Sequence, residues 1–255
     1  MEALQDAQTA PVRPRLSALR SFIARTLETS NFGFIPGKEM LRDLQQAKGF
    51  SSSHLDDFCE SWGDLQLDAY MGDGGKYRRR RHATMSAAAG GRTIKMEPHQ
   101  PHFQALTYNT LNGDIAREYE PIRSDIAQGP VMTGLVELCG QVFGSLQPDA
   151  KWHIEVHQFH IDAMIDGGKP TPEGIHRDGV SFVLMTMIER YNIKDGRTSL
   201  FDKTGSPLAE FTLMRPFDTA IINDEELRHG VTPIFRDNPE NPGHRDVLVV
   251  TFAKR

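Results

Sequence analysis

Apolar residues recur at helical spacing through much of the first 150 residues of the chain. Such a repeat places the apolar side chains on one face of a helix. Ser17 stands where an N-cap is expected before the first of these segments, and Pro130 suits the first turn of the last. The pattern predicts four helices, over residues 16–27, 36–47, 52–62 and 130–146.

Beyond residue 150 the pattern changes to short alternating or apolar runs separated by Gly, Pro, Asn and Asp. Alternation with a period of two is typical of strands that bury one face. The runs predict strands over residues 152–161, 180–191, 198–202, 208–213, 219–224, 227–235 and 245–253. So many short strands favour an antiparallel sandwich or jelly-roll barrel. The expected fold class is α+β, with the N-terminal helices packed on that β core.

We expect one folded unit over residues 1–255, with a helix-rich half (15–149) and a β-rich half (150–255) that carries the functional site. Residues 1–14 are polar and contain proline, so we expect them to be flexible. The helical half is the surface through which we would expect a homodimer to form.

Four consecutive arginines, Arg78 to Arg81, lie in a segment that resembles a strand. Alternate residues of a strand point to opposite faces, so Arg78 and Arg80 would face one way and Arg79 and Arg81 the other. A row of charges divided between two faces is a poor track for a nucleic-acid backbone. We expect one solvated face, and a second that pairs with carboxylates or lines a pocket.

Hydrophobic residues make up 38% and charged residues 25% of the 255, as in ordinary folded proteins. The formal net charge is -5, which gives no overall attraction to nucleic acid or to anionic membranes. The two cysteines, Cys59 and Cys139, are far apart, and the sequence has neither an apolar leader nor a run long enough to span a bilayer. We therefore expect a cytoplasmic protein without disulfides that binds neither nucleic acid nor membranes.

Four His-x-Asp pairs offer candidate metal ligands, because two residues at this spacing share one face of a strand. They are His54/Asp56, His160/Asp162, His176/Asp178 and His244/Asp246. The first lies in a predicted helix, where this spacing does not share a face. The second lies at the end of a predicted strand and is either a ligand pair or a set of polar residues on one sheet face. The fourth opens the last predicted strand, so His244 and Asp246 point to the face opposite Arg245, and one of these two sets must face the interior.

His176 and Asp178 have the most favourable context, between a Pro/Gly-rich loop and a buried apolar run. His229 in a later strand could complete a set of two histidines and one carboxylate, which leaves three positions of an octahedral Fe(II) open. Arg245 begins the last strand, where a guanidinium could bind a carboxylate with two hydrogen bonds. From spacing alone, a set of satisfied polar residues is an equal alternative.

The strings PTPEGIHRDGVSFV, VHQFHI, YRRRRHATM and YNTLNGDIAREYEPI resemble the Fe(II)/2-oxoglutarate-dependent dioxygenases, and within them the bacterial isoleucine dioxygenase group. The likeness runs from about Phe34 to the C-terminus. It implies a double-stranded β-helix core of the cupin type, and Fe(II), 2-oxoglutarate and O2 as cofactors, with ascorbate as an activator in vitro. The implied reaction hydroxylates an unactivated C–H bond of a free aliphatic L-amino acid and releases succinate and CO2.

The resemblance also implies roles for single residues. His176, Asp178 and His229 match the iron ligands, and Arg245 matches the arginine that holds the distal carboxylate of 2-oxoglutarate. Where the family often has Ser or Thr near that arginine, this chain has Asp246 and Val247, so the second contact is expected from Thr251 or Tyr191. The family's halogenases carry a small residue in place of Asp178, which disfavours halogenation.

An amino-acid substrate needs a site for its carboxylate and acceptors for its ammonium. Tyr108 and Arg117 are candidates for the first role, and Asp114 and Glu118 for the second, although a charged surface loop would explain the same residues. Two other functions stay open: a dioxygenase acting on a peptide, protein, nucleobase or other small molecule, and a cupin-like metal-binding module without oxidative chemistry.

Overall fold

The computed structural model describes residues 17–109, 111 and 113–255. The segment 1–14, for which we expect flexibility, lies outside the described residues. The helices are α1 (Ala18–Ser30), α2 (Gly37–Lys48), α3 (Ser52–Glu60), the 3-10 helix η1 (Ser61–Asp64), α4 (Ser124–Ala127) and α5 (Pro130–Leu146). The strands are β1 (Phe32–Ile35), β2 (Gln66–Leu67), β3 (Arg78–Ala87), β4 (Ile94–Met96), β5 (Trp152–Asp162), β6 (Phe182–Tyr191), β7 (Ile193–Asp195), β8 (Thr198–Phe201), β9 (Pro207–Phe211), β10 (Thr219–Asn223), β11 (Arg228–Val231), β12 (Ile234–Arg236) and β13 (His244–Lys254).

The four longest helices lie where the sequence predicts them, and local signals fix their ends. The Ser17 hydroxyl accepts a hydrogen bond from the Arg20 backbone N–H at the start of α1. Ser51 and His54 form a reciprocal capping pair at the start of α3. Asn31 and Gly49, both in the left-handed conformation, end α1 and α2.

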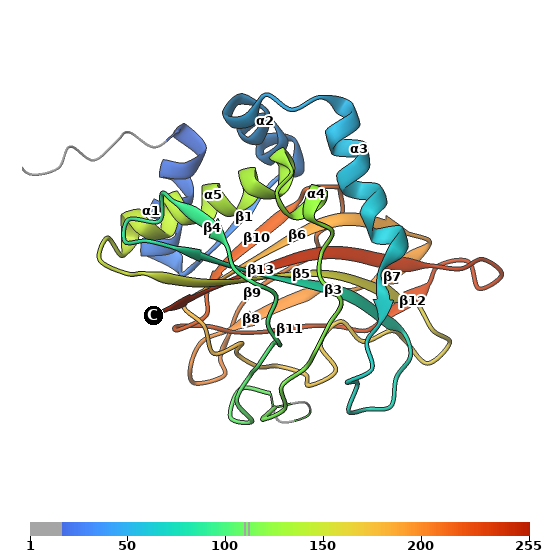
Figure 1. Cartoon of the computed structure of the whole chain (residues 1–255). Coiled ribbons are helices and arrows are strands. Elements are labelled where there is room, and N and C mark those ends of the chain that lie inside the picture. The colour runs from blue at the N-terminus through green and yellow to red at the C-terminus, as the bar shows by residue number, and fades with distance from the viewer. Residues whose placement is uncertain (1–16, 110, 112) are drawn as a thin grey trace, which may run out of the picture.

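A large antiparallel sheet organises the molecule, with strand order β1-β10-β6-β13-β5-β3-β2 and β4 paired to β3. Two smaller sheets, β11-β8-β9 and β12-β7, lie on one side of it, and the helices cover its other side (Figure 1). This is the expected α+β jelly-roll with helices packed on its β core. The strands before residue 150 join the same sheet, since β3 pairs with β5 and β1 with β10. No helix among the described residues is long and apolar enough to cross a bilayer.

Strand parity decides which side chains reach each face of the large sheet. On β13, Leu248, Val250 and Phe252 belong to the core beneath the helices. Their neighbours at the odd-numbered positions 245, 247, 249 and 251 line a cavity on the opposite face. The helix-side core, which includes Phe143 and Trp152, therefore anchors the sheet, and the other face is left for a site.

The arginine strand β3 follows the expected alternation. Arg78 and Arg80 are buried on the cavity face, and their guanidinium groups lie 2.7 and 3.7 Å from the Asp68 carboxylate. Arg79 and Arg81 face the other way and pair with acidic side chains at 2.6 and 3.2 Å. The run is thus divided between the two faces of the sheet, and each of its arginines has a carboxylate partner.

Candidate active site

A cavity of about 370 Å³ opens on the concave face of the large sheet. Side chains from β3, β5, β6 and β13 form one wall, and β11 with the loops 102–109 and 170–180 forms the other. Residues that lie more than 170 positions apart in the sequence therefore meet at this cavity, and the antiparallel register of the strands decides which of them face one another.

His176, Asp178 and His229 meet at this cavity. His176 and His229 lie opposite each other in an antiparallel bridge, with both N–H···O hydrogen bonds at 2.9 Å. Residues paired in this way point to the same face. Nε2 of His176 lies 3.3 Å from one Asp178 oxygen, and Nε2 of His229 lies 3.8 Å from the other. Two imidazoles and one carboxylate so placed offer the nitrogen and oxygen donors that suit a non-haem Fe(II).

Asp224, which the sequence analysis did not single out, holds the loop that carries Asp178. Its fully buried carboxylate accepts hydrogen bonds from the backbone N–H groups of Asp178, Gly179 and Val180 at 3.0, 2.9 and 3.1 Å. It also lies 3.9 Å from Nδ1 of His229. An aspartate directly after an apolar strand was the available signal, but its partners are 44 to 46 residues away.

Two features of the structure, one conformational and one steric, explain why the HRDG string has glycine at position 179. Gly179 has φ +80°, which disfavours residues with a side chain. A Cβ at this position would lie 2.4 Å from the ring of Tyr108. The turn that presents Asp178 therefore packs closely beneath the loop that covers the cavity.

The two histidines of this group have pKa values shifted in opposite directions. Burial opposes ionisation of His176, but hydrogen bonding to Asp178 outweighs it and raises the pKa of His176 to about 9. Burial lowers the pKa of His229 to about 4, with a contribution from His176. Binding of a metal cation requires neutral imidazoles, so it would displace the proton of His176.

Arg245 lies in the same cavity as a buried cation that forms no ion pair with a described residue. Its guanidinium makes no hydrogen bond or ion pair within the described part of the chain, and Nε is fully buried. Burial, with a contribution from the nearby Arg190, lowers the pKa of Arg245 to about 10, and Asp246 opposes this only in part. A buried cation of this kind is costly unless an anion reaches it. The site therefore fits the distal carboxylate of a 2-oxo diacid.

The structure places the two expected helpers of Arg245 elsewhere. Thr251 lines the cavity, but it is six residues along β13 from Arg245, roughly 20 Å at the rise of an extended strand. It lies opposite Glu155. Tyr191 is half exposed and does not line the cavity. Neither residue can share one small carboxylate with Arg245 in this arrangement.

The four residues expected at the substrate divide into two pairs. Tyr108 and Arg117 line the cavity. Asp114 and Glu118 do not: the Asp114 carboxylate accepts the Leu106 backbone N–H at 2.9 Å, and Glu118 is exposed. Asp114 therefore shapes the loop and does not face a ligand in this cavity.

The other three His-x-Asp pairs lie outside the cavity. His54 belongs to the cap of α3. His160 bonds Asp246 at 2.6 Å and Asp162 at 3.2 Å, so two of the pairs form one ion-pair network on β5 and β13. Burial lowers the pKa of His160, but these hydrogen bonds outweigh it and raise that pKa to about 9. We interpret this network as satisfied polar residues of the opposite sheet face.

Comparison with known proteins agrees with this geometry. The model of the 2OG-Fe dioxygenase family matches residues 59–251, and the chain belongs to this family. It is a 2-oxoglutarate-dependent non-haem iron dioxygenase, which uses Fe(II), 2-oxoglutarate and O2. The relationship expected from the sequence strings is thereby confirmed.

Particular relatives are known. The chain is 25% identical to the 3(1)-hydroxy-L-isoleucine 4-dioxygenase of Pantoea ananatis, over 91% of this chain and 95% of that protein. A crystal structure of a bsmA homologue from Methylobium petroleophilum PM1 is 32% identical, with a TM-score of 0.81 and 92% of both chains covered. The structure of IDO from Bacillus thuringiensis has a TM-score of 0.76 at 16% identity, covers 92% of this chain and 99% of that one, and supports the fold alone.

The role of Asp224 can be tested with Asp224→Asn. The amide would turn a donor toward backbone N–H groups, so we expect the loop to shift and Fe(II) affinity to fall by about 10- to 100-fold, as for other outer-shell partners. Metal titration monitored by tryptophan fluorescence or calorimetry measures this. Asp218→Asn is the matched control, because Asp218 also accepts three backbone N–H bonds but lies outside the cavity. Equal loss of Fe(II) affinity in both variants would contradict the assignment.

Proposed function

We propose that this dioxygenase hydroxylates an unactivated C–H bond of a free aliphatic L-amino acid, with release of succinate and CO2. His176, Asp178 and His229 hold the iron, and Arg245 binds the distal carboxylate of 2-oxoglutarate. The amino-acid class is supported by the relative from Pantoea ananatis, whose name gives a hydroxylated isoleucine as its substrate.

One observation carries this proposal: the cavity contains two buried guanidinium groups that lack a carboxylate partner. Arg78 and Arg80 share Asp68, whereas Arg245 and Arg117 have no acidic partner among the described residues. Arg117 is 2% exposed, and its Nε has no hydrogen bond. Two unpaired cations in one cavity call for two carboxylates, one from each of two small molecules.

The size of the cavity supports small ligands. Its volume of about 370 Å³ is near the lower end of the roughly 300–1000 Å³ common for small-molecule sites. Val183, Met185 and Val249 supply an apolar stretch of wall suited to an aliphatic side chain. A peptide or nucleobase substrate would be better matched by a longer open groove.

Within this site the protein's own residues position the co-substrate and the substrate and shield them from water. When bound, iron and 2-oxoglutarate supply the oxidising chemistry that activates O2. The chain fixes the carboxylate ends of both organic molecules, so only one C–H bond of the substrate lies near the metal. The apolar wall and the loop 102–109 exclude water.

A panel of twenty L-amino acids tests the proposal. Iron-loaded protein is incubated with 2-oxoglutarate, ascorbate and each amino acid, and mass spectrometry records succinate and any gain of one oxygen. We expect at least one aliphatic L-amino acid to gain oxygen and to raise succinate formation about tenfold or more over the unstimulated rate, because coupled turnover depends on a correctly placed substrate. If no amino acid is oxidised, the assigned substrate class is wrong. Metal binding without any succinate would instead favour a non-oxidative module.

A further inference from the structure

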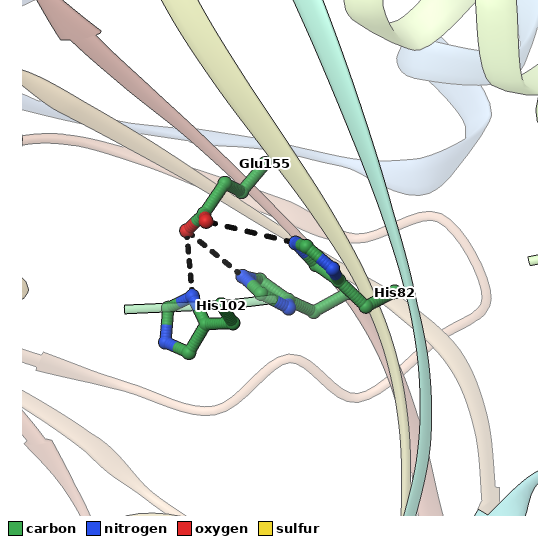
Figure 2. Close-up of side chains that lie close together, drawn as sticks. His82, His102 and Glu155 are labelled. Carbon is green, nitrogen blue, oxygen red and sulfur yellow. Dashed lines mark hydrogen bonds and ion pairs between the residues drawn. The ribbon is translucent and has the colours of Figure 1, made fainter. Parts of the chain in front are cut away.

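Glu155 lies at the centre of a group of histidines on the cavity wall. His82 on β3, His102 on the loop that covers the cavity and His157 on β5 surround its carboxylate, and Figure 2 shows His82 and His102 directed at it from different segments. Glu155, His102 and His157 line the same cavity as the iron ligands. None of these four residues is a candidate ligand or substrate contact from the sequence alone.

The register of the sheet brings this cluster together. His82 lies directly opposite His157 across β3 and β5, and their rings stack with centroids 4.8 Å apart. Nδ1 of His102 lies 2.7 Å from a Glu155 oxygen, within hydrogen-bond distance. The Nε2 atoms of His82 and His157 lie 3.6 and 3.7 Å from the carboxylate, too far for a direct hydrogen bond. The carboxylate thus keeps free lone pairs.

The protons of the cluster can be placed from its contacts. Arg80 donates to Nδ1 of His157 at 2.6 Å, so the proton of a neutral His157 ring stands on Nε2, toward Glu155. Burial lowers the pKa values of His82, His102 and His157, so the rings are neutral. Burial alone would raise the pKa of Glu155, but the hydrogen bond with His102 and the other nearby histidines, which include His153 at 3.7 Å, outweigh it and lower that pKa. Glu155 is therefore an anion with one short hydrogen bond, and the rings around it are neutral.

An unpaired cation lies next to this anion. Arg117 is joined to His102 by two backbone hydrogen bonds of 2.9 and 3.0 Å in an antiparallel bridge, so their side chains share one face. The His102 ring in turn bonds Glu155. The Arg117 guanidinium donates to Gln104 Oε1 at 3.5 Å and has no acidic partner among the described residues. One wall of the cavity thus presents a carboxylate and a guanidinium without a counter-ion on neighbouring positions, a pattern complementary to a zwitterion.

We propose that Glu155 binds the ammonium group of the amino-acid substrate while Arg117 binds its carboxylate. This inference rests on the proposed function and replaces Asp114 and Glu118 as the expected ammonium acceptors. The three histidines are positioning residues: they hold Glu155 ionised and fix its direction. The site would select for α-amino acids and against molecules that lack either charged group.

A metal ion is the alternative occupant of the cluster, since its donor atoms all lie within 4.8 Å of one another. Two contacts disfavour it. The proton of His157 stands on the nitrogen that faces Glu155, and the guanidinium of Arg80 touches the cluster, which opposes a divalent cation. An ammonium group instead donates hydrogen bonds to the carboxylate and carries a single charge.

The test uses an amino acid that the panel identifies and two analogues of it. For L-leucine these are 4-methylpentanoic acid, which lacks the ammonium, and L-leucinamide, which lacks the carboxylate charge. We expect the wild type to prefer the amino acid over both in kcat/KM by at least ~100-fold, as sites built around buried polar groups do. In Glu155→Gln the preference over the des-amino acid should collapse, and the preference over the amide should remain. In Arg117→Met the reverse is expected.

The controls separate a positioning effect from general damage. Glu118→Gln changes the exposed neighbouring glutamate, and we expect it to keep both preferences. The KM for 2-oxoglutarate should stay unchanged in Glu155→Gln if the fold is intact. Equal loss of both preferences, or no change in either, overturns the inference.

Two further outcomes are informative. A panel in which no amino acid is oxidised defeats the proposed function itself, before any variant is made. Titration of the metal-free protein with Zn²⁺ should give one site per chain that is lost in Asp178→Ala. A second site, retained in Asp178→Ala and lost in Glu155→Gln, would show that the cluster binds a metal and would overturn the ammonium assignment.

Discussion

Asp178→Ala is expected to abolish hydroxylation and to weaken Fe(II) binding by well over the ~100-fold that the loss of an outer-shell partner costs. The carboxylate is the only anionic member of the triad, and it lies 3.3 and 3.8 Å from the two imidazole nitrogens that would share the metal. Without it, two neutral histidines would have to hold a dication alone. Metal titration and succinate formation, measured on the same preparation, test both effects.

Asp162→Ala is the matched control for this change. It makes the same substitution in another His-x-Asp pair, which lies on the opposite face of the sheet and bonds His160 and Arg79. We expect it to lower stability slightly and to leave Fe(II) affinity unchanged. Loss of Fe(II) binding in Asp162→Ala, or normal turnover in Asp178→Ala, would show that the iron does not bind at His176, Asp178 and His229.

Arg245→Met is expected to raise the KM for 2-oxoglutarate roughly 100-fold. Removing one partner of a buried, hydrogen-bonded charge pair costs about 2–5 kcal/mol, and most of this loss should fall on the co-substrate. The KM for the amino acid should change little, because Arg117 lies on a different part of the wall. Initial rates with 2-oxoglutarate and the amino acid varied in turn separate the two constants.

The same substitution should stabilise the protein when no co-substrate is present. Arg245 is 3% exposed and forms no ion pair with a described residue, so burying it costs free energy in the free enzyme. A methionine of similar length removes that cost. We expect a higher Tm, by about 2–4 °C for each kcal/mol gained in a chain of this size.

The effect on Tm is checked by adding 2-oxoglutarate and by substituting an exposed arginine. Saturating 2-oxoglutarate should raise the Tm of the wild type and leave Arg245→Met unchanged. Arg197→Met removes an exposed arginine paired with Glu210 and should alter neither Tm nor KM appreciably. A lower Tm in Arg245→Met without ligand would mean that this guanidinium has a structural partner and does not await an anion.

Much of the fold was accessible from the sequence because its signals are local. The apolar spacing and caps placed α1, α2, α3 and α5, and alternation placed most strands after residue 150. The short strands β1 and β7 were missed, and the single strand expected over residues 227–235 is divided into β11 and β12, because strands of three or four residues give few positions for a pattern. β1 exists because β10 offers it a partner edge, which no local signal reports.

The candidate site likewise contains residues that local patterns predicted and residues that they did not. Parity within one strand predicted that His176 and Asp178 would share a face and that Arg78 and Arg80 would oppose Arg79. The second contact for Arg245 could not be found in this way: Thr251 has the right parity but lies at the wrong distance along β13.

The sequence by itself determined the periodicity, the caps and the ligand types of this protein, because these depend on neighbours within a few residues. Context and family resemblance had already singled out His176 and Asp178 with His229. Only the tertiary structure decided that Asp224 holds the loop of Asp178 and that Glu155 lies among several histidines. These relations depend on the register between residues far apart in the chain, such as His82 and His157, which are 75 residues apart. A shift of one residue in any pairing would turn these side chains to the other face of the sheet, and the core beneath the helices fixes that register.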